Sequence, residues 1–180
     1  MNKKSLKKPI IEKFDLSLTD KGCFLTFGGE IYLTKNGNKV CVPNENLIEI
    51  LKPEFKDYNI LRSSKFSLTK ILISFADKLP HDKSIFVDEL IKYLETDLLF
   101  YRVSTPRSLS FSQSEKWDKI IHIFDSIFQT SWSVSTNIMP LKQDPESIQK
   151  IKDYLISLDI LNLHIMTYLL KVTGSCIVTV

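Results

Sequence analysis

The sequence predicts an α+β protein, in which a small antiparallel β-rich N-terminal domain precedes an α-helical C-terminal domain. Short apolar segments separated by glycine turns fill residues 11–42, and amphipathic helical patterns continue from residue 82 to the end. The apolar fraction of 43% and the aromatic fraction of 11% over 180 residues are typical of chains that fold around a core. We therefore expect two domains, at residues 1–80 and 81–180.

Four short strands are expected in the first domain. Residues 11–18 alternate between apolar and polar side chains, and residues 23–27 and 30–34 follow as two further strands. Gly28-Gly29 between them is expected to form a tight turn or a bulge. The candidates for the inward face of the first strand are Ile11, Phe14, Leu16 and Leu18.

A hairpin and two helices complete this domain. Asn36-Gly37 is a hairpin signal because both residues tolerate positive φ, and residues 39–42 are the returning strand, which Pro43 closes. Asn44 is a suitable N-cap for a helix over residues 45–51, before Pro53. After a polar loop at residues 56–65, a second helix begins near Ser67 and stops at Pro80. Its apolar face is expected to consist of Leu68, Ile71, Leu72, Phe75 and Leu79.

The C-terminal domain is predicted to consist of helices in sequence. Asp82 is expected to cap a helix over residues 84–101, and a connector with Pro106 leads to a second helix over residues 108–128. The apolar stripe of the first helix is Ile85, Phe86, Leu90, Ile91 and Leu94, and that of the second is Phe111, Trp117, Ile120, Ile121, Phe124 and Phe128.

The last third of the chain continues this pattern. Residues 131–136 are a strand-like insert, and Asp144 with Pro145 behind it is a strong helix start. Residues 158–161 are expected to form a turn before a last helix that begins near Asn162.

Composition argues against several classes of function. The net charge of +3 is small for a nucleic-acid-binding protein, and the apolar tail at residues 160–180 is interrupted by His164 and Lys171, so we expect no membrane span. The basic residues 1–8 are expected to be a solvated terminus rather than an address signal. Three widely separated cysteines indicate reduced thiols, with Cys23 and Cys41 as structural residues in strands.

No catalytic or metal pattern is visible. His81, His122 and His164 are each about forty residues apart, so they lack the spacing that places two zinc ligands on one helix face. No serine lies in a G-x-S-x-G elbow, and Gly28-Gly29 belongs to neither a dinucleotide fingerprint nor a P-loop. We therefore expect no enzyme activity, no metal and no cofactor.

The residues around the Pro106 connector are the strongest candidates for a functional site. Asp97 and Arg102 are five residues apart, so they do not stack on one helix face as a simple surface pair. Tyr101, Gln113, Trp117 and Asp118 lie nearby in the sequence. Two interpretations stay open: a polar cluster that fixes the connector, or a contact surface for a partner, since Arg, Tyr and Trp are enriched at interface hot spots.

The same stretch carries a family resemblance. Residues 96–102 read TDLLFYR, and P-x-x-L-x-x-x-Q-x-x-x-W-D follows from Pro106 to Asp118. This pattern resembles the mitochondrial and proteobacterial assembly-chaperone family that handles the alpha subunit of the F(1) sector of ATP synthase. Further segments resemble the family in the same order: Phe27-Gly28-Gly29-Glu30 with Thr34-Lys35, Glu54-Phe55, Phe66-Ser67-Leu68-Thr69, Ile138-Met139-Pro140 with Gln143, and Thr173-Gly174-Ser175.

The resemblance implies a non-enzymatic task. A member of this family binds the unassembled alpha subunit and shields its beta-facing surface until the complex forms, as a monomer in the bacterial cytoplasm or, in a eukaryote, in the mitochondrial matrix. Asp97, Tyr101, Arg102, Gln113, Trp117 and Asp118 are then the candidate partner-binding residues. Members continue with further helices, including an acidic stretch implicated in chaperone function, so a chain that ends at Val180 is expected to be truncated. The alternatives are an interaction module of the same fold with a different client, and a small hydrolase with a site assembled from distant residues.

Overall fold

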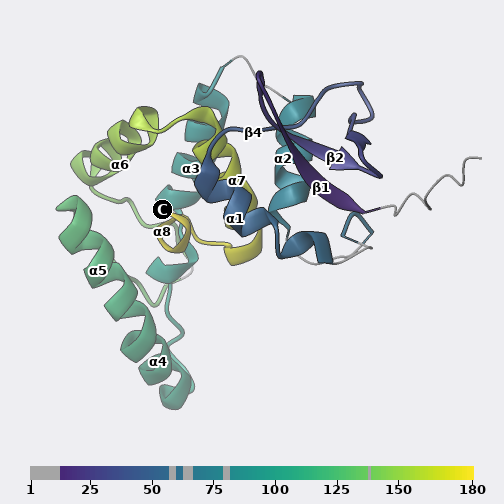
Figure 1. Ribbon diagram of the computed structural model, residues 1–180. Helices are drawn as coiled ribbons and strands as arrows, with labels where there is room; N and C mark the ends of the chain where they lie inside the picture. Colours follow the sequence, from purple (N-terminus) through teal and green to yellow (C-terminus); the bar gives the residue numbers. More distant parts are fainter. Residues whose placement is uncertain (1–12, 57–59, 63–66, 79–81, 138) are drawn as a thin grey trace, which may run out of the picture. The chain divides into compact units, whose positions relative to one another are not determined.

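The chain forms an antiparallel sheet near the N-terminus followed by a series of helices (Figure 1). The computed structural model describes residues 13–56, 60–62, 67–78, 82–137 and 139–180. The chain folds into two compact units, residues 1–79 and 80–180. The predicted α+β class is confirmed, whereas the division into independent domains at residues 1–80 and 81–180 stays a prediction.

The sheet is built around one central strand. β2 (Gly22–Phe27) pairs antiparallel with β1 (Phe14–Thr19) along one edge, from Phe14 opposite Phe27 to Thr19 opposite Gly22. Its other edge is shared by β3 (Glu30–Ile31) and β4 (Cys41–Val42). Cys23 and Cys41 lie in these strands as predicted, and all three cysteines are free.

Two glycine turns set the register of the sheet. Gly28 and Gly29 both have positive φ, 61° and 86°, and they join Phe27 directly to its partner Glu30, so the predicted tight turn is confirmed. In the Asn36-Gly37 hairpin only Gly37 has positive φ, 80°. The chain still reverses there, because Leu33 and Lys39 form an antiparallel bridge.

The predicted inward face of the first strand is correct only at its start. Phe14 is buried and Leu16 is half-buried, but Leu18 is 82% exposed, so its prediction is wrong. Leu18 lies in an edge strand, beside the turn that joins β1 to β2, and the apolar alternation of the sequence continues there although the core does not cover the side chain. Ile11 lies outside the described residues.

Two helices follow the sheet. α1 (Glu45–Leu51) has the predicted bounds, and the side chain of Asn44 caps it by accepting the Leu47 N–H at 3.0 Å. α2 (Leu68–Lys78) buries Leu68, Ile71 and Leu72 as predicted. Leu79 and Pro80 lie outside the described residues, as does most of the expected loop at residues 56–65.

The second unit is helical. Its α-helices are α3 (Ser84–Glu95), α4 (Arg107–Gln113), α5 (Lys119–Phe128), α6 (Pro145–Ser157), α7 (Ile160–Thr173) and α8 (Cys176–Thr179). α3 packs against α6, α7 and α8, and α5 packs against α8. The core of this unit is formed by side chains from residues 86–180, with Leu90, Leu94 and Phe100 fully buried.

The helix predicted over residues 84–101 ends at Glu95. A single 3-10 turn, Leu98–Phe100, follows, and Tyr101 is already extended. Because the residues of this turn are also apolar, the sequence pattern did not show that the helix ends at Glu95. Ile85 is 58% exposed, so its place in the predicted stripe is wrong, and Val87 is buried instead. Asp82 accepts the N–H of Ser84, but Lys83 occupies the N-cap position of α3, so the prediction that Asp82 is the cap residue is only partly correct.

The helix predicted over residues 108–128 forms in three segments. Between α4 and α5, residues Ser114–Asp118 adopt a π-helix. A π-helix has more residues per turn, which rotates the residues before it away from the face that Ile121 and Phe124 bury. Phe111 is accordingly 72% exposed, and its prediction as an inward residue is wrong.

The remaining predictions are partly correct. Residues 131–136 form one parallel bridge, Tyr101 with Ser135, rather than a strand. Asp144 caps α6 and accepts the N–H groups of Glu146 and Ser147, as predicted. α7 begins two residues before Asn162, because Asp159 caps it. No helix in the described part of the chain has the length and apolarity needed to span a membrane.

Candidate functional site

The connector after α3 forms an extended segment held by neighbouring backbone. The N–H of Arg102 donates to Ser135 O at 2.8 Å, and the N–H of Ser135 donates to Phe100 O at 2.8 Å. The Phe100 ring stacks on Trp132 with centroids 5.3 Å apart. These contacts fix residues 100–102 against the 131–136 segment.

Arg102 is the centre of the site, and its side chain is only 4% exposed. One guanidinium nitrogen, Nη2, lies 2.7 Å from Asp118 Oδ1, and Nη1 donates to the carbonyl of Leu99. The guanidinium carbon also lies 4.9 Å from the centroid of the Trp117 ring. A buried cation needs such partners, since an unpaired one would cost several kcal/mol, on the order of 3–5. The contact with Trp117 adds a cation–π attraction.

The π-helical segment places the partners of Arg102. Trp117 and Asp118 are consecutive in it, and both contact the same guanidinium group. Short π-helical segments are frequent at functional sites because they turn side chains away from their regular positions. Sequence reasoning found these two residues but not the backbone conformation that directs them.

Two glutamine side chains bind extended backbone on either side of this site. Gln113 Oε1 accepts the N–H of Val103 at 2.8 Å. Gln143 makes two bonds with Ser133: its Oε1 accepts the N–H at 2.9 Å and its Nε2 donates to the carbonyl at 3.1 Å. Tyr101 contributes a third tie, because its hydroxyl accepts the N–H of Leu141 at 3.1 Å. These side chains satisfy backbone groups that no regular element would pair.

Asp97 does not join the Arg102 cluster. It is 1% exposed, and its carboxylate accepts the N–H of Leu99 at 3.0 Å, the Ser175 hydroxyl at 2.9 Å and the N–H of Ile177 at 3.1 Å. Burial raises the pKa of this carboxyl, although the hydrogen bonds act in the opposite direction. The same burial, with Asp97 nearby, raises the pKa of the Cys176 thiol to about 12. Asp97 therefore joins the start of the 3-10 turn to the start of α8 and does not contact Arg102 through a hydrogen bond or ion pair in the described residues.

An open pocket of about 440 Å³ lies beside the connector. Its lining consists of Tyr101, Arg102, Val103, Thr136 and Asn137. Thr136 and Asn137 are exposed, while Tyr101 and Val103 are half-buried. Of the six predicted site residues, Tyr101 and Arg102 line this pocket, and Gln113, Trp117 and Asp118 contact residues 102–103.

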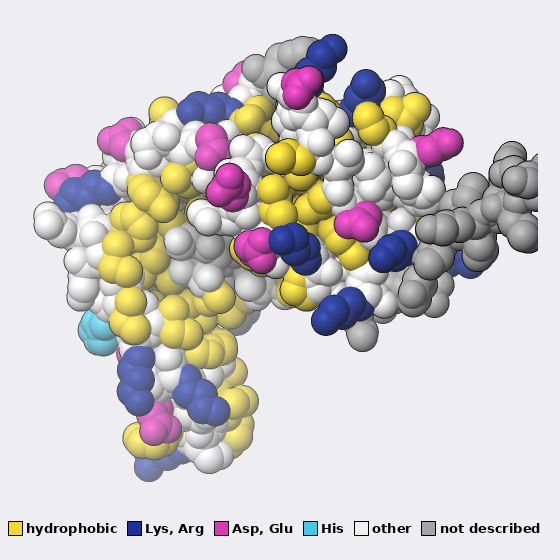
Figure 2. Space-filling view, viewed as in Figure 1, with side chains coloured by type: hydrophobic (Ala, Val, Ile, Leu, Met, Phe, Trp, Pro, Cys, Tyr) yellow, Lys and Arg dark blue, Asp and Glu magenta, His cyan; other side chains and the backbone are white. Residues whose placement is uncertain are grey.

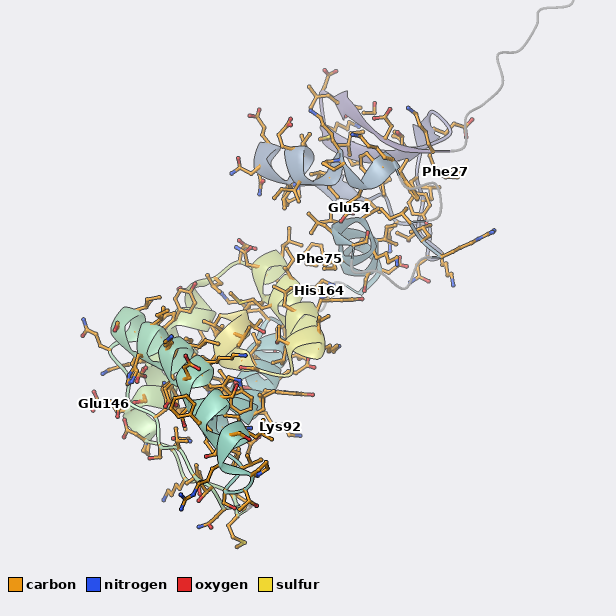
Figure 3. All side chains as sticks on the ribbon, turned by 90° about the horizontal axis from the view of Figure 1, so that it is seen from below. Phe27, Glu54, Phe75, Lys92, Glu146 and His164 are labelled. Atoms are coloured by element: carbon orange, nitrogen blue, oxygen red, sulfur yellow. The ribbon has the colours of Figure 1, made fainter. Side chains whose placement is uncertain are left out.

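A second polar contact links two of the resembling segments in the first unit. The Glu54 carboxylate accepts the N–H groups of Leu68 and Thr69 at 2.8 and 2.9 Å, and the hydroxyls of Ser67 and Thr69 at 2.9 and 2.7 Å. Figure 3 shows Glu54 beside α2, and its hydrogen bonds are with the first residues of that helix. A carboxylate at this position caps the helix and complements its dipole. Both segments were noted in the sequence for their family resemblance, but the sequence did not predict the hydrogen bonds between Glu54 and residues 67–69.

The described residues hold no cluster of three or more His, Cys, Asp or Glu side chains that could bind a metal ion. His122 is exposed on α5, and His164 is buried between the rings of Phe86 and Tyr168. His81 lies outside the described residues.

The chain is similar to known chaperone proteins in sequence and in structure. Residues 15–125, more than half of the chain, match a family of chaperone proteins. The chain belongs to this family, described as ATP12 chaperone protein. Membership in a chaperone family points to a role in assembly rather than in catalysis. No individually curated protein matches the chain.

Solved structures share the fold. Atp12 from Paracoccus denitrificans is 23% identical, with a TM-score of 0.76 over 92% of this chain and 72% of its own. A putative chaperone from Agrobacterium tumefaciens, Atu1473, is 16% identical, with a TM-score of 0.77 over 93% of this chain and 64% of its own. Both proteins are longer than the part that this chain matches.

Proposed function

We propose that this chaperone binds the unassembled alpha subunit of the F(1) sector of ATP synthase and shields its beta-facing surface until the complex forms. The observation that carries the proposal is the ordered motif between Thr96 and Asp118, which resembles chaperones that act on this subunit. Membership in the ATP12 chaperone protein family supports it.

The physical task suits a binding protein. A free alpha subunit exposes apolar surface that the beta subunit covers later, and exposed patches of this kind drive aggregation. A chaperone that covers the patch must bind more weakly than the beta subunit does. Exchange then follows from the difference between two affinities, and no nucleotide or other cofactor is required.

We assign client contact to the surface around the connector. Tyr101, Gln113, Trp117 and Asp118 retain exposed area, whereas Arg102 and Asp97 are buried and act by holding their neighbours in place. Three backbone segments are immobilised there by side-chain hydrogen bonds, which reduces the entropy that binding would otherwise cost. We propose that the protein acts as a monomer, in the bacterial cytoplasm or the mitochondrial matrix.

The test is complex formation between the full chain and purified free alpha subunit. We expect a one-to-one complex in size-exclusion chromatography at micromolar concentration, and no binding to the assembled F(1) sector. An absence of binding to free alpha would refute the proposal.

A matched pair of variants locates the contact. Asn137→Arg places a long charged side chain at the exposed wall of the connector pocket, while Asn46→Arg makes the same change on exposed α1. We expect Asn137→Arg to weaken alpha binding at least about tenfold, equivalent to about 1.4 kcal/mol, and Asn46→Arg to leave it unchanged. Equal affinities in calorimetry would move the contact away from the connector.

A further inference from the structure

A second open pocket lies on the helical unit, away from the connector, and its walls are almost entirely apolar. It has a volume of about 450 Å³ and is bounded by α5, by Tyr154 of α6 and by α8. α5 contributes Ile123 and Ile127, which are 62% and 67% exposed, and α8 contributes Val178, which is 48% exposed. Among the lining residues, Tyr154 is the one whose side chain has a polar group.

Figure 2 shows hydrophobic side chains gathered over the region where α5 and α8 lie in Figure 1. Ile123 and Ile127 are one helical turn apart, so both project from the same face of α5. Large apolar side chains grouped in this way on a surface mark an interaction site more often than scattered ones do. We name this surface the α5–α8 groove.

The walls of the groove decide what kind of backbone it can receive. They consist of side chains on helices whose N–H and C=O groups bond within the helices themselves, so the groove presents no strand edge. An extended peptide would bury unpaired backbone groups there, at a considerable cost in free energy. A helix satisfies its own backbone and can lay an apolar face into such a groove.

The charged side chains beside the groove indicate which charge the polar edge of the bound helix would carry. Lys119 precedes Ile123 by four residues and lies on the same face, and Lys116 lies three residues before Lys119, in the π-helical segment. Both lysines are exposed, and neither forms an ion pair with any residue that the structure describes.

The acidic residues of the same helix do not cancel these charges. Asp118 pairs with Arg102, and Asp125 lies two residues from both Ile123 and Ile127, so it projects from another side of α5 than the groove. Glu115 is eight residues before Ile123, farther from the groove than either lysine. The edge of the groove next to α5 is therefore basic.

We propose that the α5–α8 groove is a docking site for an amphipathic helix of a protein partner, with apolar side chains facing Ile123 and Ile127 and acidic side chains facing Lys116 and Lys119. The site is separate from the connector, so it stands whether or not the alpha subunit is the client. Nothing in the connector cluster contributes to its lining.

The probe is a synthetic amphipathic peptide of about 18 residues, long enough to form a helix, with leucines at i, i+3, i+4 and i+7 and glutamates along one edge. A matched peptide carries lysines in place of the glutamates. Binding of each labelled peptide to the full chain is followed by fluorescence anisotropy at low and high salt. We expect the glutamate peptide to bind at least about tenfold more tightly at low salt and to lose this advantage at high salt.

Variants of the chain locate the binding. Ile127→Asp is expected to weaken binding of the glutamate peptide at least about tenfold, while Val172→Asp, at a 70% exposed apolar position on α7, leaves it unchanged. The double variant Lys116→Glu/Lys119→Glu leaves the apolar lining intact, and we expect it to reverse the preference in favour of the lysine peptide. Circular dichroism confirms that each variant is folded.

Three outcomes would overturn the proposal. The first is that neither peptide binds, and the second is that the two peptides bind equally and the charge-reversal variant makes no difference. The third is that the protein dimerises in sedimentation experiments and Ile127→Asp abolishes the dimer, which would assign the groove to a second copy of this chain. Alpha-subunit binding measured on the same Ile127→Asp variant reports on the proposed function separately.

Discussion

Asp97 shows how much depends on one buried carboxylate. Its two oxygens receive donors from the start of the 3-10 turn and from the start of α8, segments separated by about eighty positions in the chain. Removing the acceptor would leave the Ser175 hydroxyl and the Ile177 N–H without a partner in a buried environment. Such groups cost about 1–3 kcal/mol each when they are left unsatisfied.

We therefore predict that Asp97→Asn destabilises the protein by about 1–3 kcal/mol, because the amide nitrogen cannot accept a hydrogen bond. Urea denaturation at pH 7 measures the change in the free energy of unfolding. Asp82→Asn, at an exposed residue that caps a single N–H, is the matched control and should have a smaller effect.

The pH dependence provides a second readout for the same variant. Because the pKa of Asp97 is raised in the folded state, the folded protein takes up a proton before the unfolded chain does. Its stabilising effect is complete below the unfolded pKa of about 3.9 and is lost as the pH rises through the higher folded value. The stability gap between wild type and Asp97→Asn should widen as the pH falls from about 7 toward about 4. A gap that narrows over this range would contradict the burial argument.

At the scale of elements, the start of α2 depends on a residue outside the helix. Glu54 lies in a short 3-10 turn, fourteen positions before Leu68, and its carboxylate binds two N–H groups of the first helical turn. Glu54→Gln removes the charge and turns one acceptor into a donor. We predict a loss of about 1–2 kcal/mol, in the range of a lost helix cap, together with faster amide exchange at Leu68 and Thr69.

Glu49→Gln is the control for this prediction. Glu49 is exposed and pairs with Lys52 on the surface of α1, where an ion pair contributes at most about 1 kcal/mol. If the two variants have equal stability and equal exchange at the start of α2, Glu54 is not a cap in solution.

The elements that the sequence predicted correctly are those with local signals. The caps of α1 and α6 depend on Asn44 and Asp144, each within three residues of the N–H group that it binds. The end of α3 was missed because apolar residues continue beyond Glu95 with no glycine or proline to mark the break. The π-helical segment was missed because its sequence, SEKWD, is compatible with an ordinary helix.

The sequence predicted which residues belong to the candidate site, but it did not predict which of them contact one another. The motif singled out Asp97 and Arg102 together, yet their partners are different: Arg102 binds Asp118, whereas Asp97 binds Ser175 and Ile177. These contacts form only when distant segments meet, so periodicity and capping rules contain no information about them. The α5–α8 groove was also missed, because the predicted apolar stripe of this helix left out Ile123 and Ile127, and the sequence does not show that their side chains lie beside α8.

At the scale of the whole molecule, each of the two compact units has a core of its own. The first buries Leu25, Val40, Leu51 and Ile71, and the core cluster of the second is drawn entirely from residues 86–180. A core that is complete within one segment is what allows a segment to fold alone.

We predict that residues 1–80 and residues 81–180 fold independently when they are expressed separately. Segments of this size bury only about 60% of the surface that their unfolded chains expose, so each should be less stable than a typical domain but cooperative. The measurement is a two-dimensional amide NMR spectrum of each segment compared with that of the full chain. Dispersed peaks that coincide with full-chain peaks, except near the cut, are the expected result. A collapsed spectrum for residues 81–180 would show that the helical unit needs the first 80 residues to fold, and the two units would then form a single cooperative domain.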